Sequence, residues 1–500
     1  MRGLIGALII ACLLGWLFSR SWKKEHDEPI WFIPRKKGFK THFLFPPTWM
    51  FWVLLFIFSL FLLAYGILDG LVYFETLSLK VLLFLSAYFV LLLLLMPLMR
   101  RWFSARACAT LWLIPTFLFL TWSTSLRVFS GLSLKIYIPR QVLSIIGIIW
   151  AAGFLAVTGY YLISHLVFRS RVKKHTTRVT DEETCAILRK EQLEIFYLWP
   201  LTLRRGEVKA PFSMGTTRWS RCIVLPDCRY TPEELSMIFR HELHHLQRSD
   251  VETKIFLCLC KAFCWFNPLV WIATRKAAED LERSCDEIVT EEMEKPERQA
   301  YAKLLLDAAA PGQGCTTCLS AAAGTLRYRL KSIMDQRERW PGSLMLGSVV
   351  FVFVICFGMI SISSVDARGS LTSLALPAEI EEIGEIMYRD ENGCYWTAEC
   401  DAEVFQEALG KIEVEHITGM ESPPHGGRDI SFLLSDGTRA LHCSLDEKSF
   451  IVTDWITYKT VGWYLIKNTV NWDTIFASLH GIERNDFLNT LADTLAEVFQ

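Results

Sequence analysis

"TPEELSMIFRHELHHLQRSD", residues 231–250, is a polar stretch in a chain that is otherwise rich in long apolar runs. Thr231 can cap a helix with its hydroxyl, Pro232 fits the first turn, and Glu234 stands three residues after the cap, as in a capping box. Apolar residues then recur at helical spacing: Leu235, Ile238, Phe239 and Leu246. The sequence therefore predicts a helix that begins here and buries one face.

Two histidines of this helix, His241 and His245, are four residues apart and project from one face. This spacing suits two ligands of one tetrahedral zinc ion. Glu242 is placed to act as a general base on a water molecule and to pass the proton to a leaving amine. His244 points away from the pair, and we expect it to pack or face solvent. The motif alone leaves a second interpretation open, a surface helix that happens to carry histidines.

A catalytic zinc site also needs a third protein ligand. The stretch AAEDLERSCDEIV, residues 277–289, offers one in Glu282, which shares a helix face with Asp286. Glu282 would complete a His-His-Glu set, and Asp286 could accept a hydrogen bond from a ligand histidine and fix its tautomer. The same acidic residues would also fit a solvated helix face, so this alternative stays open.

The apolar runs indicate a membrane protein. The chain has 500 residues, 52% of them hydrophobic, and a net charge of −1, which gives no indication of a nucleic-acid partner. Its 15 cysteines show no even framework, which excludes a small disulfide scaffold. Since about 20 apolar residues cross a bilayer, we predict spans near residues 4–18, 49–68, 81–99, 105–122, 142–168 and 344–362.

Lys and Arg residues set the expected orientation. They cluster after the first, third and fifth expected spans and before the sixth, which assigns these four segments to the cytoplasm. The loop at residues 69–80 carries little charge and fits outside. The consistent orientation places the N-terminus and residues 365–500 outside and residues 169–340 in the cytoplasm. Arg127, Lys135 and Arg140 are a mild signal against this orientation, because they lie in the loop between the fourth and fifth expected spans, which it places outside.

The expected fold class is a multi-pass α-helical membrane protein with a cytosolic α+β domain and a small extracellular α+β domain. We expect two additional membrane helices in residues 1–80, three core helices in 81–168, the zinc domain in 169–340, a last span in 341–364 and the outer domain in 365–500. In the zinc domain, residues 223–225 predict a strand, and helices are expected from residues 231, 269 and 298. In the outer domain Asp436-Gly437 predicts a hairpin turn, and residues 472–500 predict amphipathic helices.

Two long motifs carry a family resemblance: HELHHLQRSD, and FNPLVWIATRKAAEDLERSCDEIV at residues 266–289. Together with the upstream APFSMGTTRWSRCIVLPD, they resemble the BlaR/MecR-type antirepressor metallopeptidases, which are membrane-embedded gluzincins. The resemblance covers about residues 81–362. It implies that His241, His245 and Glu282 bind zinc, that Glu242 is the catalytic base and that Asp286 is the supporting aspartate.

The chain departs from this family in two respects. The first two expected spans form an added pair, and the outer domain is too short for a penicillin-binding domain and has no S-x-x-K from residue 366 onward. We therefore expect a zinc endopeptidase of the cell membrane that responds to an unknown extracellular ligand without β-lactam acylation. It would cleave a cytosolic repressor, itself, or both.

The alternatives are a constitutive membrane protease for processing or quality control, and a non-catalytic receptor stabilised by zinc. Membrane lipid and a repressor protein are the expected partners, and nucleic acid is not. The sequence leaves a homodimer open.

Overall fold

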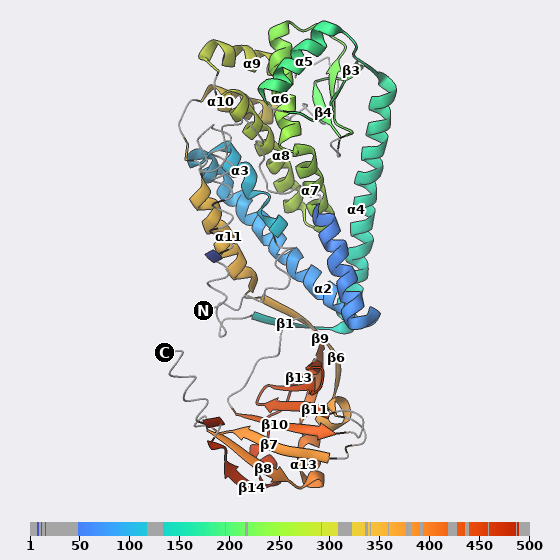
Figure 1. Ribbon diagram of the computed structural model, residues 1–500, viewed down its shortest axis with the longest axis vertical. Helices are drawn as coiled ribbons and strands as arrows, with labels where there is room; N and C mark the ends of the chain where they lie inside the picture. Colours follow the sequence, from blue (N-terminus) through green and yellow to red (C-terminus); the bar gives the residue numbers. More distant parts are fainter. Residues whose placement is uncertain are drawn as a thin grey trace. The chain divides into compact units, whose positions relative to one another are not determined.

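The structure is a computed structural model that describes Leu8, Ile9, Cys12 and Trp16 and then residues 49–117, 134–195, 197–215, 219–291, 293–308, 323–335, 339–340, 342–358, 360–376, 380, 382–390, 394–418, 428–435, 440–458, 460–486 and 488–489. The chain divides into two compact units (Figure 1). Unit 1 comprises Met1–Ile57, Val81–Leu132 and Ile149–Met359, and unit 2 comprises Phe58–Lys80, Ser133–Ile148 and Ile360–Gln500. The expected span at residues 4–18 lies almost wholly outside the described residues.

Helix α2, Trp49–Trp102, contains the second and third expected spans. Its backbone reverses at Gly66, whose φ of 79° is readily adopted only by glycine. Tyr65 and Tyr73 stack across this reversal with ring centroids 4.1 Å apart. The prediction of a loop at residues 69–80 is therefore wrong, because one glycine turns the chain and these residues are helical.

The fourth expected span, residues 105–122, is not one continuous helix in its described part, residues 105–117, and residues 118–122 lie outside the described residues. Helix α3 extends only over Ala105–Leu111, all of it buried in protein, and a 3-10 turn at Ile114–Phe117 follows. Pro115 explains the break, because the residue before a proline disfavours the helical conformation. The apolar character of residues 105–111 therefore reflects burial against helix α8.

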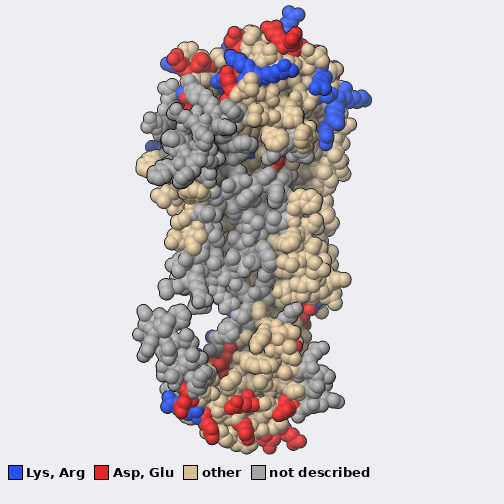
Figure 2. All heavy atoms as spheres, in the orientation of Figure 1, with Lys and Arg blue, Asp and Glu red and all other residues tan. Residues whose placement is uncertain are grey.

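Two helices among the described residues are long and apolar enough to cross a membrane, Leu54–Trp102 and Arg140–His175. The second is helix α4; charged side chains gather at its C-terminal end, while the middle of its visible face is uncharged (Figure 2). Helix α11, Ser343–Gly358, is apolar but shorter. Strand β6 begins at Ile360, so the last apolar helix ends before the predicted residue 362.

After α4, unit 1 forms an α+β body. Its sheet has the order β2 (Thr176–Arg178), β3 (Thr202–Gly206), β5 (Cys222–Pro226) and β4 (Phe212–Met214), with only β3 and β5 parallel. Its helices are α5 (Glu182–Glu194), α6 (Pro232–Gln247), α7 (Asp250–Phe263), α8 (Pro268–Val289), α9 (Lys295–Ala308) and α10 (Ala323–Met334). The expected strand at 223–225 and the three expected helices are confirmed. Ile223 of β5 packs in one core with Leu235 and Phe239 of α6, which fixes the orientation of α6 on the sheet.

Unit 2 is built on a ten-stranded sheet. Its order is β1 (Leu134–Pro139), β6 (Ile360–Ser370), β9 (Glu413–Thr418), β13 (Thr460–Ile466), β12 (Ser449–Asp454), β11 (Ala440–Asp446), β10 (Asp429–Ser435), β7 (Glu382–Arg389), β8 (Tyr395–Cys400) and β14 (Leu479–Arg484). The pairing of β1 with β6 is parallel, and all others are antiparallel. Unit 2 also contains helices α12 (Leu371–Ala375), α13 (Ala402–Gly410) and α14 (Trp472–Phe476). The ring centroids of Phe405 in α13 and Phe432 in β10 lie 5.2 Å apart.

Three expectations for unit 2 have different outcomes. The hairpin is confirmed by the antiparallel pairing of β10 with β11, although its turn lies outside the described residues. The helical prediction for the tail is wrong at residues 479–484, because β14 completes the edge of the sheet beside β8. Strand β1 was not expected, since its segment was interpreted as a loop between spans.

Candidate metal centre

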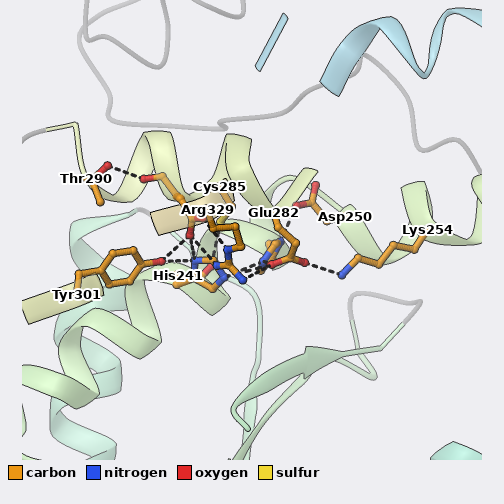
Figure 3. A network of polar contacts seen from close by, with 10 residues as sticks. His241, Asp250, Lys254, Glu282, Cys285, Thr290, Tyr301 and Arg329 are labelled. Carbon is orange, nitrogen blue, oxygen red and sulfur yellow. Dashed lines mark hydrogen bonds and ion pairs between the residues drawn. The ribbon is translucent and has the colours of Figure 1, made fainter. Parts of the chain in front are cut away.

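Helix α6 holds the predicted motif. The expected capping box is present: the Thr231 hydroxyl accepts from the Glu234 backbone N–H at 3.3 Å, and the Glu234 carboxylate accepts from the Thr231 N–H at 2.9 Å. Near the other end of the helix, the Nε2 atoms of His241 and His245 lie 3.0 Å apart (Figure 3). Both side chains are buried, and so is His244, in agreement with packing rather than solvent exposure. The interpretation of this stretch as a histidine-bearing surface helix is therefore wrong.

The second ring nitrogen of each histidine has an oxygen partner. Nδ1 of His245 is 2.6 Å from Oδ2 of Asp250, and Nδ1 of His241 is 2.8 Å from the hydroxyl oxygen of Tyr301. These partners assign the Nδ1–H tautomer to both rings, since an aspartate oxygen only accepts and Tyr301 uses its own proton on Asp286 at 2.9 Å. Both Nε2 lone pairs are then directed toward one point between the rings.

Glu282 of helix α8 faces the same point. Its Oε2 lies 3.5 Å from Nε2 of His245 and 3.8 Å from Nε2 of His241. Its other oxygen, Oε1, accepts from Nζ of Lys254 at 3.1 Å. Burial raises the pKa of the Glu282 carboxyl, but Lys254 and the two histidines lower it more, so that the pKa lies well below its ordinary value. The structure thus brings all three predicted metal-binding side chains together.

Asp286 is one turn further along α8 and is almost fully buried. It does not contact a histidine directly as predicted: its Oδ1 is 3.6 Å from Nδ1 of His241, and Tyr301 bridges the two. Arg329 of helix α10 binds both Asp286 oxygens at 2.7 Å and lies 3.4 Å from Glu282. The interpretation of α8 as a solvated acidic face is therefore wrong for Glu282 and Asp286, because both point into the protein.

Glu242 lies at the wall of a cavity of about 250 Å³. The cavity is lined by Pro211, Cys228, Arg229, Tyr230, Glu234, Ile238, His241, Glu242, Tyr301, Leu304, Leu305 and Asp307. Within the part of the chain that the structure describes, the Glu242 carboxylate forms no hydrogen bond or ion pair. A buried carboxylate without such a partner, beside a cavity, is available to bind and release a proton.

Sequence reasoning missed Cys285. Its Sγ and one nitrogen from each of His241 and His245 all lie within 4.8 Å of one another, and all three residues are buried. Burial raises the pKa of the Cys285 thiol, but the two histidines outweigh burial and lower it to about 7. The signal was present in the sequence, since Cys285 follows Glu282 by three residues and so lies on the same side of α8. Asp250, Tyr301 and Arg329 were also missed.

The donor set fits zinc. Two imidazole lone pairs 3.0 Å apart beside a carboxylate are unfavourable without a cation between them. Two ligands of a tetrahedral zinc ion with Zn–N distances near 2.0–2.1 Å are separated by roughly 3.3 Å, which is close to this spacing. Nitrogen and carboxylate oxygen, with or without a thiolate, are the ligands that zinc takes in proteins. His241, His245 and either Glu282 or Cys285 could hold it.

Comparisons with known proteins agree with this chemistry. Residues 129–333 match the BlaR1 peptidase M56 family. Regulatory protein BlaR1 of Bacillus licheniformis is 27% identical over 220 residues, which are 42% of this chain and 36% of that protein. The chain thus matches only about a third of the length of this relative. The family match includes every side chain described above, and it confirms the resemblance inferred from the two long motifs.

Proposed function

Residues 129–333 match the BlaR1 peptidase M56 family, and from this similarity we propose that the protein is a membrane zinc endopeptidase that transmits a signal. His241, His245 and Glu282 bind the zinc, Glu242 is the catalytic base, and Asp286 supports His241 through Tyr301. One observation carries the proposal: two Nε2 atoms 3.0 Å apart, each on a ring whose Nδ1 already has an oxygen partner.

When bound, zinc supplies Lewis acidity to the scissile carbonyl and lowers the pKa of a water molecule. The Glu242 carboxylate accepts the proton of the attacking water and delivers it to the leaving amine nitrogen. Asp250 and Tyr301 hold the two imidazole rings in the Nδ1–H tautomer, which keeps Nε2 available. The apolar residues Ile238, Leu304 and Leu305 of the cavity wall offer a contact for an apolar substrate side chain.

The signalling part of the proposal rests on how the chain runs through unit 2. Strand β1 leads directly into helix α4, and strand β6 follows helix α11. The two strands pair in parallel, from Leu134 with Ile360 to Pro139 with Val365. Arg140, the first residue of α4, also donates to Asp366 of β6 at 2.8 Å. A change in the unit 2 sheet can therefore act on both apolar helices at their outer ends.

We propose that residues 365–500 face the outside and that residues 169–340 face the cytoplasm, where the enzyme cleaves a repressor protein or itself. The outer ligand binds reversibly near residues 429–463. Of the aromatic side chains there, Trp455 and Tyr458 are exposed by 44% and 76%, whereas Tyr464 is buried. The exposed pair offers a contact surface for a ligand or partner.

A constitutive protease would share the same metal centre, but it would not need the direct link from the sheet of unit 2 to α4 and α11. A receptor with purely structural zinc would not need Glu242. A carboxylate that has no hydrogen bond or ion pair among the described residues, at a cavity wall, favours catalysis over a closed structural site.

The test is a comparison of peptide fragments in cells that produce the native protein or its Glu242→Gln variant. We expect fragments of the substrate, or of the protein itself, that vanish with Glu242→Gln, because this change removes the base and keeps the proposed ligands. The matched control is Glu233→Gln, an exposed residue of the first turn of α6, which should leave the fragments unchanged. An identical fragment pattern in native and Glu242→Gln cells would contradict the proposal.

A further inference from the structure

The metal centre contains one donor more than a catalytic zinc site requires. Cys285 is fully buried and lies on helix α8 between Glu282 and Asp286 (Figure 3). Its Sγ and the nitrogens of His241 and His245 lie within 4.8 Å of one another. Zinc accepts thiolate sulfur at about 2.3 Å, and this proximity makes Sγ a candidate donor to a metal ion bound by the two histidines.

The thiol has a second position available. In the structure Sγ donates to the backbone carbonyl oxygen of His241 at 3.5 Å, and this hydrogen bond is weak because a thiol is a weak donor. Exchanging this bond for a metal bond costs little and releases the thiol proton to solvent. Cys285 thus has two alternative partners, the carbonyl oxygen and a metal ion, on the same side of the helix.

We propose that Cys285 is a reversible fourth ligand that closes the zinc centre in a latent state of the enzyme. This inference rests on the proposed peptidase function. With His241, His245, Glu282 and Cys285 all bound, a tetrahedral zinc ion has no open position, and such closed sites are structural rather than catalytic. The site opens for catalysis when Sγ leaves the metal and returns to the carbonyl oxygen of His241.

Contacts with neighbouring helices hold α8, the helix that carries Cys285, in place. Asp280, on α8, binds Arg100 at the end of α2 and accepts from the indole of Trp112, both at 2.8 Å. Asp286, on the same helix, is held by Arg329 of α10. Cys285 therefore lies on a helix that binds α2 through Asp280 and α10 through Asp286. Helix α10 directly precedes α11 in the chain. With α8 held in this way, Glu282 keeps its place beside the two histidines, and only the Cys285 side chain has to move between the metal and the carbonyl oxygen of His241.

The test uses the purified full-length protein in detergent, loaded with Co²⁺ in place of zinc. We expect about one Co²⁺ per chain and a thiolate-to-cobalt charge-transfer band in the near ultraviolet. Cys285→Ser should still bind Co²⁺ but lose the band, and in cells it should cleave several-fold more substrate without a signal. Cys185→Ser, on helix α5, is the control and should keep both the band and the basal cleavage.

The possible results distinguish a failure of the latent-state proposal from a failure of the peptidase proposal. If the native protein binds one Co²⁺ without the band, or if the band persists in Cys285→Ser, Cys285 is not a ligand, and the peptidase proposal stands. If Cys285→Ser loses the band without gaining activity, the thiolate binds the metal but does not hold the enzyme latent. If the native protein binds no Co²⁺, both proposals fail. The spectrum of the native protein answers the ligand question even if the variant does not fold.

Discussion

Replacing Arg329 with methionine removes a buried cation and keeps a side chain of similar length. Arg329 is 2% exposed and binds both oxygens of Asp286 at 2.7 Å. Without it, Asp286 keeps the hydroxyl of Tyr301 as a donor but becomes a buried carboxylate with no positive partner at that distance. The side chain of Glu282 also loses a guanidinium at 3.4 Å.

The expected loss follows from burial. Breaking a buried ion pair by removing one partner costs about 3–5 kcal/mol, and the remaining Tyr301 contact favours the lower end. We expect a loss of about 3 kcal/mol in the free energy of unfolding of the zinc domain. At roughly 2–4 °C per kcal/mol for a domain of 150–250 residues, this lowers Tm by about 6–12 °C.

Thermal unfolding of the purified, metal-free protein, followed by near-ultraviolet circular dichroism, measures this loss. Arg327→Met, an exposed position on the same helix, is the control and should shift Tm by less than about 2 °C, as surface changes do. The double variant Arg329→Met with Asp286→Asn should regain part of the loss, because it no longer buries a charge. An Arg329→Met protein as stable as the Arg327→Met control would refute the buried ion pair.

Three further predictions concern pH, orientation and the outer ligand. Burial lowers the pKa of His241, but Cys285 and Glu282 outweigh burial and raise the pKa from 6.5 to about 9. Protonated His241 therefore stabilises the metal-free protein fully below pH 6.5, and this stabilisation is lost as the pH rises through about 9. Zinc affinity measured by calorimetry should increase over the same pH interval, and an affinity that does not change with pH would contradict this prediction. Reporter fusions near residues 36 and 174 should report the cytoplasm and fusions after residue 366 the outside, and an outside signal at residue 174 would exclude a cytosolic substrate. A fluorescent penicillin should leave no labelled band on a denaturing gel, and a band that is lost on mutation of one outer serine would show acylation.

Local signals in the sequence were sufficient for the helix and the metal-binding motif. The capping box at Thr231 and Glu234 and the spacing of His241 and His245 depend on residues within one helix, so the sequence predicted them correctly. The family resemblance then linked this helix to Glu282. Tyr301 and Arg329 were not predicted because Tyr301 lies 60 residues from His241 and Arg329 lies 43 residues from Asp286. Only the packing of α9 and α10 against α6 and α8 brings these pairs together.

The errors in the fold have a common physical cause. Hydrophobicity alone does not distinguish a helix that is buried in protein from one that faces lipid, and residues 105–111 are of the first kind. Strand β14 has a weak strand signal of its own and forms because β8 offers unpaired backbone groups beside it. Strand β1 has Ile136, Tyr137 and Ile138, which favour strands, but the segment was interpreted as a loop between spans. The reversal at Gly66 depends on one residue with positive φ, which a search for loops by charge could not detect.

The most direct test of the metal centre is the zinc content of the purified protein and its variants, measured by atomic emission. The native protein and Glu242→Gln should each hold about one zinc per chain, because Glu242 acts as the base and is not a ligand. His241→Ala and His245→Ala should lose the metal, and Glu282→Ala should bind it more weakly. A His245→Ala protein that retains a full equivalent of zinc would contradict the assignment of the histidine pair as the metal-binding site.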